Sequence, residues 1–384
     1  MPSSRGEPSS GFVKIGFVLY DYYPFGGLQE DCLATALATV ERGHVAIVFT
    51  RTWKGDRPDD LNIVLFGKRG WTNTSRNEHF FADLKTAIPA HQLDGVVAFN
   101  RIPHADIYYA ADPCYLERCR EMSFWQRLSP RHHYYASLER RMFGKPDHPT
   151  TLVLTAREID AFAKHYPIDR TRFHLLPPGV RKVPTPEKAG IIRQTLRGEL
   201  NTPDAATVVL FVGSGFRIKG LDRAIKAMSA NRSAAEGLEF WVVGNGKNEK
   251  FQRLADQSGV NVRFFGGRAD ADRFYQSADC LLHPAYSESA GKVLLEALTH
   301  GLPVLTTDTC GYAAHIMKAG AGDVIPSPFD QNKLNETLQS FILDAGKRRT
   351  MQRNALDYAA TEDLYSCHQT AATWIETTLQ TIRG

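Results

Sequence analysis

Residues 283–297 read HPAYSESAGKVLLEA, and they follow the short apolar run DCLL. The run predicts a buried strand, the residues rich in Pro, Ser and Gly predict a turn, and the apolar spacing from Lys292 onward predicts a helix. Glu288 therefore lies in a loop between a strand and a helix. Glu296 lies about two turns into that helix.

This strand–loop–helix unit offers two kinds of ligand contact. Ser289, Ala290 and Gly291 leave backbone N–H groups uncovered at the predicted helix N-terminus, which is a site for anions. Glu288 and Glu296 would flank an anion held there, and their carboxylates suit sugar hydroxyls. A nucleotide sugar carries both phosphate and hydroxyl groups. The alternative is that Glu288 is a solvated loop residue and that Glu296 lies on the helix by chance. Either glutamate considered alone would favour this alternative.

The length, composition and charge of the chain fit a two-domain globular protein. At 384 residues the chain is long for one hydrophobic core, and its 43% hydrophobic and 23% charged residues are ordinary values. The formal net charge of +4 is too small to indicate a nucleic-acid-binding protein from overall charge. The six cysteines include no Cys-x-x-Cys pair and are interpreted as reduced core residues of a cytosolic protein.

The N-terminus and the apolar runs bear on localisation. Residues 1–11 are polar and lack an apolar segment, which predicts a flexible tail rather than a signal peptide. No apolar run approaches the length needed to span a bilayer. We therefore expect a protein that is soluble or peripheral on a membrane.

The chain continues with a strand–helix–strand pattern after this tail. Residues 13–20 are an apolar run, residues 28–42 show helical apolar spacing, and a second apolar run begins at residue 44. This pattern indicates a βαβ unit of a parallel sheet. Gly26 and Gly27 in its first loop let the backbone approach a ligand at the carboxyl edge of the sheet, or form only a tight turn. The loop lacks the Gly-x-Gly-x-x-Gly pattern of dinucleotide sites.

A second glycine-rich loop follows a predicted strand in the second half of the chain. Residues 213–222 read GSGFRIKGLD, so that Arg217 and Lys219 stand between the glycines and a predicted helix. This order can cradle a phosphate group, although it lacks the Gly-Lys-Ser/Thr order of a Walker A loop. Further on, Asp270 and Asp272 form an Asp-x-Asp pattern. They stand where a helix is expected to begin, so we expect them to cap that helix rather than to bind a metal.

The segment from Ala111 to Lys145 has an unusual composition. It contains seven Lys or Arg and four Asp or Glu, and aromatic residues such as Phe124 and Trp125 lie among them. Basic and aromatic residues together suit an anionic membrane surface or a phosphorylated, lipid-linked glycan. Nucleic acid would bind the same residue types. The alternative is a helical insertion whose aromatic residues are core and whose charges are solvated.

Several of these motifs resemble known glycosyltransferases. Residues 283–297, together with GLPV at 301–304, resemble the Glu-x7-Glu motif of the retaining, family-four glycosyltransferases. Residues 23–31, YPFGGLQED, are similar to the lipopolysaccharide core glucosyltransferase I family, which adds a sugar to inner-core heptose.

The same family resemblance extends over residues 13–366. Lys219-Gly220-x-Asp222 matches the family, whereas Arg217 stands one position earlier than the usual arginine. The polar segment 71–77, read as a loop, and residues 100–106 also resemble the family, except that His104 replaces a more usual glycine.

This resemblance implies a GT-B fold, in which two doubly wound, Rossmann-like α/β domains face each other across a cleft. We expect a tail at 1–11, an N-terminal acceptor- and membrane-side domain at 12–183, a nucleotide-sugar domain at 189–362, and a helix at 363–384 that returns to the first domain. The resemblance implies catalytic roles for Glu288, Lys219 and Arg217. The donor-binding residues that it implies are Gly26, Gly27, Asp31, Arg268, Ser289, Ala290, Gly291, Lys292, Val293 and Glu296.

The implied activity is the transfer of a hexose, glucose by family default, from a UDP-sugar to heptose of the lipopolysaccharide inner core, with retained configuration. Lys219, Arg217 and the amides near Gly291 would hold the diphosphate, Glu296 the ribose, and Glu288 the donor sugar. No metal or other cofactor is expected. The expected partners are the UDP-sugar, the heptose-containing core and, through residues 111–145, the anionic cytoplasmic face of the inner membrane, but no nucleic acid.

Three alternatives stay open at this point. Another UDP-sugar, such as galactose or an N-acetylhexosamine donor, would change only a few pocket contacts. A UDP-sugar epimerase has the same two-domain build but gives no reason for the basic, aromatic segment. A catalytically weak, membrane-associated scaffold would make Glu288 and Glu296 dispensable.

Overall fold

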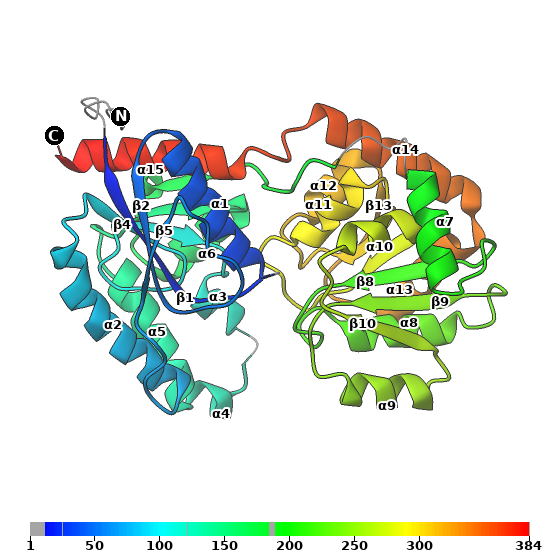
Figure 1. The fold of residues 1–384 in the computed structure, drawn as a ribbon. Helices are drawn as coiled ribbons and strands as arrows, with labels where there is room; N and C mark the ends of the chain where they lie inside the picture. The colour runs from blue at the N-terminus through cyan, green and yellow to red at the C-terminus, as the bar shows by residue number, and fades with distance from the viewer. Residues whose placement is uncertain (1–11, 25, 121, 184–188, 384) are drawn as a thin grey trace, which may run out of the picture. The chain divides into compact units, whose positions relative to one another are not determined.

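A computed structural model describes residues 12–24, 26–120, 122–183 and 189–383. The expected tail at 1–11 lies outside these residues. The chain forms two compact units, of which unit 1 comprises Met1–Pro177 with Ser366–Gly384, and unit 2 comprises Pro178–Tyr365. Each unit is a parallel sheet with helices on both faces (Figure 1), which is the expected class of doubly wound α/β domains.

Among its described residues, unit 1 holds a seven-stranded parallel sheet in the order β3-β2-β1-β4-β5-β6-β7. The strands are short apolar runs because helices cover both faces of the sheet. They are β1 (Lys14–Tyr22), β2 (Val45–Trp53), β3 (Asn62–Leu65), β4 (Gly95–Ala98), β5 (Ile107–Ala110), β6 (Thr150–Val153) and β7 (Phe173–Leu175). The helices are α1 (Gly27–Glu41), α2 (Asn73–Ala90), α3 (Tyr115–Arg118), α4 (Phe124–Arg127), α5 (Pro130–Phe143), α6 (Ala156–His165), the 3-10 turn η1 (Arg170–Arg172) and α15 (Cys367–Arg383).

The last helix, α15, belongs to unit 1 although the rest of the C-terminal half forms unit 2. It packs against α1, where His368 contacts Asp31 and Arg42 pairs with Glu376. The chain therefore returns to the first unit at its end.

Unit 2 holds a six-stranded parallel sheet in the order β10-β9-β8-β11-β12-β13, again among the residues that the structure describes. Its strands are β8 (Val208–Val212), β9 (Glu239–Val243), β10 (Val262–Gly266), β11 (Cys280–His283), β12 (Val304–Thr307) and β13 (Gly322–Ile325). Its helices are α7 (Ala189–Glu199), α8 (Leu221–Ala230), α9 (Glu249–Gln257), α10 (Ala271–Ser277), α11 (Lys292–Thr299), α12 (Ala313–Ala319), α13 (Gln331–Leu343) and α14 (Ala345–Thr361).

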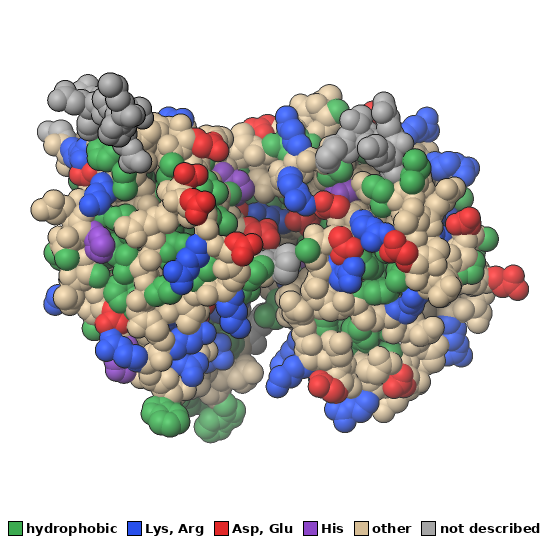
Figure 2. Space-filling view, viewed as in Figure 1, with side chains coloured by type: hydrophobic (Ala, Val, Ile, Leu, Met, Phe, Trp, Pro, Cys, Tyr) green, Lys and Arg blue, Asp and Glu red, His purple; other side chains and the backbone are tan. Residues whose placement is uncertain are grey.

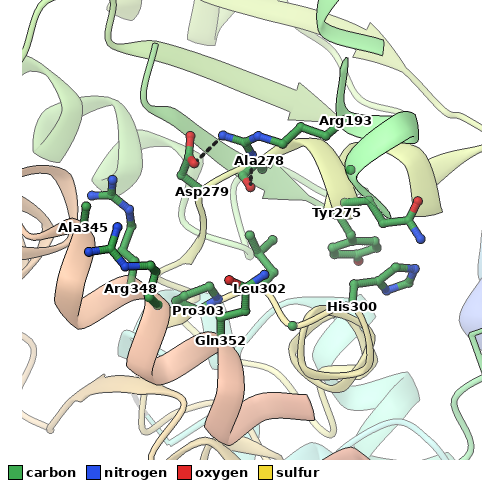
Figure 3. A pocket seen from close by; sticks show the side chains of 14 residues that line it. Arg193, Tyr275, Ala278, Asp279, His300, Leu302, Pro303, Ala345, Arg348 and Gln352 are labelled. Atoms are coloured by element: carbon green, nitrogen blue, oxygen red, sulfur yellow. Dashed lines mark hydrogen bonds and ion pairs between the residues drawn. The ribbon is translucent and has the colours of Figure 1, made fainter. Parts of the chain in front are cut away.

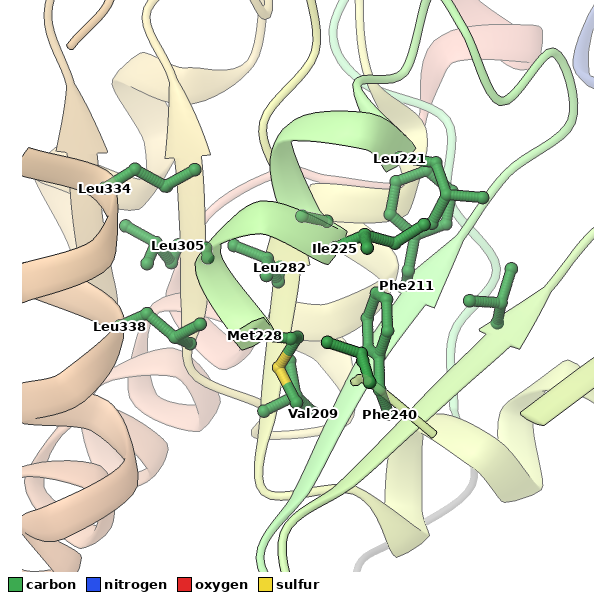
Figure 4. Packing of buried hydrophobic residues seen from close by; sticks show 14 of the residues in the cluster. Val209, Phe211, Leu221, Ile225, Met228, Phe240, Leu282, Leu305, Leu334 and Leu338 are labelled. Carbon is green, nitrogen blue, oxygen red and sulfur yellow. The ribbon is translucent and has the colours of Figure 1, made fainter. Parts of the chain in front are cut away.

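The core of unit 2 fixes the positions of its loops. Leu221, Ile225 and Met228 on one face of α8 pack on Phe211 and Leu282 of the central strands (Figure 4). Close packing of this kind leaves little freedom at the strand ends. The loops that leave β8 and β11 are therefore held at fixed positions on the carboxyl edge of the sheet.

The strand order reverses once in each sheet, between β1 and β4 in unit 1 and between β8 and β11 in unit 2. Loops leave the two strands in opposite directions at such a point, and doubly wound sheets bind ligands in the resulting crevice. In unit 2 this point is flanked by residues 213–220 and 284–291. The two motifs singled out in the second half of the sequence thus meet at one place.

Two expectations from the sequence can be compared directly with the structure. The segment 71–77 is not a loop throughout, because α2 begins at Asn73 and the Thr72 side chain accepts a hydrogen bond from the Ser75 amide as its N-cap. The six cysteines are free and buried, as expected of core residues. No helix in the described ranges is both long and apolar enough to cross a bilayer.

Candidate functional site

The loops after β8 and β11 approach closely in unit 2. Gly220, the N-cap of α8, has a left-handed φ of 77°, and a Cβ atom there would overlap the carbonyl oxygen of Pro284. Only glycine therefore fits at this position without displacing the second loop. The close approach brings the end of the first loop, with Lys219, to the second loop, with Glu288.

Lys219 and Glu288 form an ion pair at this point. Both side chains are largely buried, with exposed fractions of 23% for Lys219 and 15% for Glu288. Burial lowers the pKa of Lys219 to about 8, while the contact with the Glu288 carboxylate favours the charged ammonium. The pair places a cation and an anion side by side at the switch point of the sheet, where a ligand can engage both.

His283, at the end of β11, lies behind this pair. Its side chain is fully buried, its ring stacks on Phe211, and its Nε2 lies 3.7 Å from Glu288 Oε2. Burial and the nearby Lys219 lower the pKa of His283 to about 3, so its imidazole is neutral at pH 7. A histidine at the end of an otherwise apolar strand is a signal in the sequence that could have pointed to this position.

The N-terminus of α11 opens beside Glu288. Gly291 is the N-cap residue, with a left-handed φ of 93° and no side-chain cap. The Gly291 N-cap thus offers no capping side chain of its own to the first amides of α11. Ser289 and Ala290 are buried, and the Tyr312 amide donates to the Ala290 carbonyl at 2.7 Å, which ties this loop to the loop after β12.

Glu296 lies on α11 and is half-buried. Its Oε2 accepts a hydrogen bond from the Tyr275 hydroxyl of α10 at 2.7 Å. Tyr275 could not be anticipated from the sequence, because its side chain reaches Glu296 of α11 only in the folded structure.

Arg217 differs from Lys219 in its environment. It is exposed, and its guanidinium forms no ion pair or hydrogen bond with the described part of the chain. The structure thus brings Lys219, but not Arg217, into contact with Glu288. A contact between Arg217 and a bound diphosphate remains a prediction.

The turn that contains Arg268 lies at the same edge of the sheet. The Gly267 amide donates to Asn245 Oδ1 at 2.9 Å, and the Asn245 amide donates to Ser214 Oγ at 3.2 Å. These two bonds join the loops after β10, β9 and β8. Arg268 itself forms a two-bond ion pair with Asp270, 2.8 Å at each contact.

The expectation that Asp270 and Asp272 cap a helix is wrong in its detail. Asp270 is the N-cap residue of α10, but its side chain makes no capping hydrogen bond, because Arg268 and Arg273 engage it. Asp272 instead pairs with Arg181 at 2.6 Å. Within the described ranges, no group of three or more His, Cys, Asp or Glu side chains has the geometry of a metal site.

In unit 1 the switch point is flanked by the N-terminus of α1. Gly26 is its N-cap without a side-chain cap, and Gly27 has open space where a Cβ would lie. Gly27 is exposed at this end of α1. Asp31 is different, since it is 2% exposed and lies 2.9 Å from His368 Nε2 of α15. Its geometry supports a role in holding α15 rather than in binding a ligand.

The basic, aromatic segment 111–145 contains two kinds of aromatic residue. Tyr115 and Phe143 are core residues, as the helical-insertion alternative supposes. Phe124 and Trp125 of α4 are 68% and 79% exposed. Hydrophobic side chains protrude at the α4 end of unit 1 in Figure 2, and Lys or Arg side chains lie nearby on the same face. Glu121 lies outside the described residues.

The chain is similar in sequence to known glycosyltransferases. The model of the family described as "Glycosyl transferases group 1" matches residues 192–358, which span the switch-point loops of unit 2. The lipopolysaccharide glucosyltransferase WaaG of Escherichia coli (strain K12) is 41% identical over 365 residues, covering 93% of this chain and 97% of that protein.

Solved structures show the same relationship. The crystal structure of WaaG, a glycosyltransferase involved in lipopolysaccharide biosynthesis, matches with a TM-score of 0.89 and 40% identity, over 94% of this chain and 99% of that chain. Anabaena Alr3699/HepE in complex with UDP and glucose matches with a TM-score of 0.72 at 18% identity, over 96% of this chain and 100% of that chain, which shows a common fold alone.

The WaaG match spans nearly the whole of both proteins, in sequence and in fold. The protein therefore belongs to the lipopolysaccharide glucosyltransferase WaaG family of the group 1 glycosyltransferases, which have the GT-B fold.

Proposed function

We propose that the protein transfers glucose from UDP-glucose to heptose of the lipopolysaccharide inner core. The observation that carries the proposal is the Lys219–Glu288 pair, set beside the uncapped N-terminus of α11 at the switch point of unit 2. A cation and open amides suit a diphosphate, and a carboxylate suits sugar hydroxyls. The family membership and the fold shared with a UDP- and glucose-bound structure support the same assignment.

The diphosphate would lie between Lys219 and the N-terminus of α11. Negative charge grows on the leaving phosphate as the glycosidic bond breaks, so a fixed cation and helix dipole stabilise the transition state more than the ground state. Because the protein supplies this positive charge itself, we propose a reaction that does not depend on a metal. Arg217 adds a second, more distant cation in this proposal.

The two glutamates would orient the donor. Glu288 would accept hydrogen bonds from hydroxyls of the glucose, Glu296 from the ribose, and the turn at Arg268 would face the uracil through its backbone. We propose retention of configuration by a same-face reaction. The bond from the anomeric carbon to the phosphate oxygen breaks, the acceptor oxygen bonds on the same face, and the acceptor proton passes to the leaving phosphate.

We further propose that α4 docks on the anionic cytoplasmic face of the inner membrane. Phe124 and Trp125 of α4 and its C-cap residue Leu128 are exposed. Arg127 is the last residue of the same helix. Exposed aromatic and basic side chains together bind an anionic interface through apolar burial and charge attraction. Vesicles that contain anionic lipid should bind the wild-type protein more strongly than Trp125→Ala, whereas Leu343→Ala, an exposed apolar residue of unit 2, serves as the matched control.

The proposed reaction is tested by UDP release from a panel of UDP-sugars, with and without a heptose-bearing core acceptor. We expect acceptor-dependent release from UDP-glucose, and strong loss of release in Glu288→Gln and Lys219→Ala. Release from UDP-galactose or a UDP-N-acetylhexosamine alone would replace the donor assignment. Donor conversion without acceptor would support an epimerase, and absence of turnover together with vesicle binding would support a scaffold.

A further inference from the structure

Tyr275 holds one oxygen of Glu296. The Tyr275 hydroxyl lies 2.7 Å from Glu296 Oε2, and the Tyr275 side chain is 1% exposed. Burial and the neighbouring carboxylate raise the pKa of Tyr275 well above its ordinary value, so the hydroxyl stays protonated. The hydroxyl therefore donates a hydrogen bond to an ionised carboxylate, which is among the stronger hydrogen bonds in proteins.

His300 holds the Tyr275 ring from its face. The two rings stack with centroids 5.1 Å apart and an interplanar angle of 20°, and His300 Nδ1 lies 2.7 Å from the Glu296 carbonyl oxygen. His300 directly follows α11 as its C-cap residue. The ring that positions the Glu296 carboxylate is thus itself positioned by the end of the helix that carries Glu296.

Figure 3 shows Tyr275 and His300 side by side along one wall of a pocket of about 360 Å³, which also lies against Pro303 at the amino end of β12. Two arginines of this pocket are already engaged, Arg193 by Asp279 and Arg348 by carbonyl oxygens at the end of α13. The pocket lies at the amino edge of the sheet, whereas the switch-point loops leave the carboxyl edge. The Tyr275–His300 pair thus reaches Glu296 from the side opposite the proposed donor.

We propose that Tyr275 is a positioning residue for ribose recognition, and that it acts through Glu296. Its hydroxyl occupies Oε2, while Oε1 accepts no hydrogen bond from the residues that the structure describes. Fixing one oxygen removes rotational freedom from the glutamate and leaves the other oxygen to accept from the ribose hydroxyls. This inference rests on the proposed function, and it assigns the site a preference for ribonucleoside over deoxyribonucleoside diphosphates.

The test compares UDP with 2′-deoxy-UDP and 3′-deoxy-UDP, titrated into the full-length protein by calorimetry. We expect wild type to bind UDP about tenfold more tightly than at least one deoxy analogue, since a lost hydrogen bond to a charged group has about this effect. Tyr275→Phe should lose about five- to tenfold in affinity for UDP and little for that analogue. In turnover, the same variant should raise KM for the donor and leave kcat nearly unchanged.

Tyr358→Phe is the matched control, because it removes another buried tyrosine hydroxyl of unit 2, which is bonded to His315 rather than to Glu296. It should bind UDP as wild type does. His300→Gln removes the stacked ring and should show a smaller loss of the same pattern, which keeps the test available if Tyr275→Phe fails to fold.

Three results would overturn the inference. Tyr275→Phe could bind UDP as tightly as wild type, or it could lose UDP and both deoxy analogues equally, as a general loss of structure would produce. Either result is compatible with the proposed function if wild type still binds UDP and Glu296→Gln binds UDP more weakly. Failure of wild type to bind UDP at all would remove the proposed function and the inference together.

Discussion

Replacing Lys219 by Met should reduce kcat/KM far more than replacing Arg217 by Met. The two cations are two positions apart in one loop, so each variant serves as a control for the other. Lys219 contacts Glu288 in a largely buried environment, whereas Arg217 is exposed. We therefore expect Lys219, rather than Arg217, to stabilise the leaving diphosphate.

The magnitude follows from the burial of the two charges. Unit charges about 4 Å apart interact by ~4 kcal/mol at an effective dielectric constant near 20, which applies to Lys219. Loss of a preorganised charge of this kind costs about 10²- to 10³-fold in rate. An exposed cation such as Arg217 contributes about 0–1 kcal/mol, or less than roughly sixfold.

The assay is acceptor-dependent UDP release at donor concentrations well below KM, which reports kcat/KM. Thermal unfolding of both variants is the control, because Lys219→Met removes the ammonium group that pairs with Glu288. Equal losses in the two variants, or a larger loss in Arg217→Met, would refute the assignment.

Three further predictions concern pH, packing and stability. Because the pKa of Lys219 is lowered to about 8 in the unliganded protein, kcat/KM should fall as pH rises through about 8. A bound diphosphate raises that pKa, so kcat should persist to higher pH. Rate profiles from about pH 6 to pH 10 would show both effects. Gly220→Ala should lower both activity and the unfolding temperature, because its φ of 77° costs a side chain ~1–2 kcal/mol and the Cβ overlaps Pro284. Glu139→Ala should lower the free energy of unfolding by about 3–5 kcal/mol in denaturant titrations, because it removes the buried carboxylate that pairs with buried Arg101 and leaves that guanidinium only the exposed Asp112 as an anionic partner.

Local patterns in the sequence predicted the elements that local forces determine. The strand, loop and helix of residues 279–299 appear where apolar spacing and glycine place them. His104, which stands where the family resemblance implies a glycine, adopts a left-handed φ of 68° that glycine tolerates more easily. Thr72 is a local signal that was missed. Threonine is a favoured N-cap residue, and here its side chain accepts a hydrogen bond from the amide three positions later, at the start of α2.

Tertiary contacts could not be predicted in this way. Asp31 and His368 are 337 positions apart, and nothing in the spacing of either residue indicates the other. Tyr275 of α10 meets Glu296 of α11 only in the tertiary fold, so the likeness of Glu296 to a family motif says nothing of its partner. The division of residues 111–145 into core and exposed aromatics likewise depends on which side of α3, α4 and α5 faces the sheet.

The central claim is that the Lys219–Glu288 site of unit 2 transfers a hexose to a heptose-bearing acceptor. The most direct measurement is the mass of a heptose-bearing core oligosaccharide after incubation with UDP-glucose and the protein. The account predicts a gain of one hexose with wild type and no gain with Glu288→Gln, provided that the variant unfolds at the wild-type temperature. An unchanged acceptor with wild type, or an equal gain with Glu288→Gln, would contradict it.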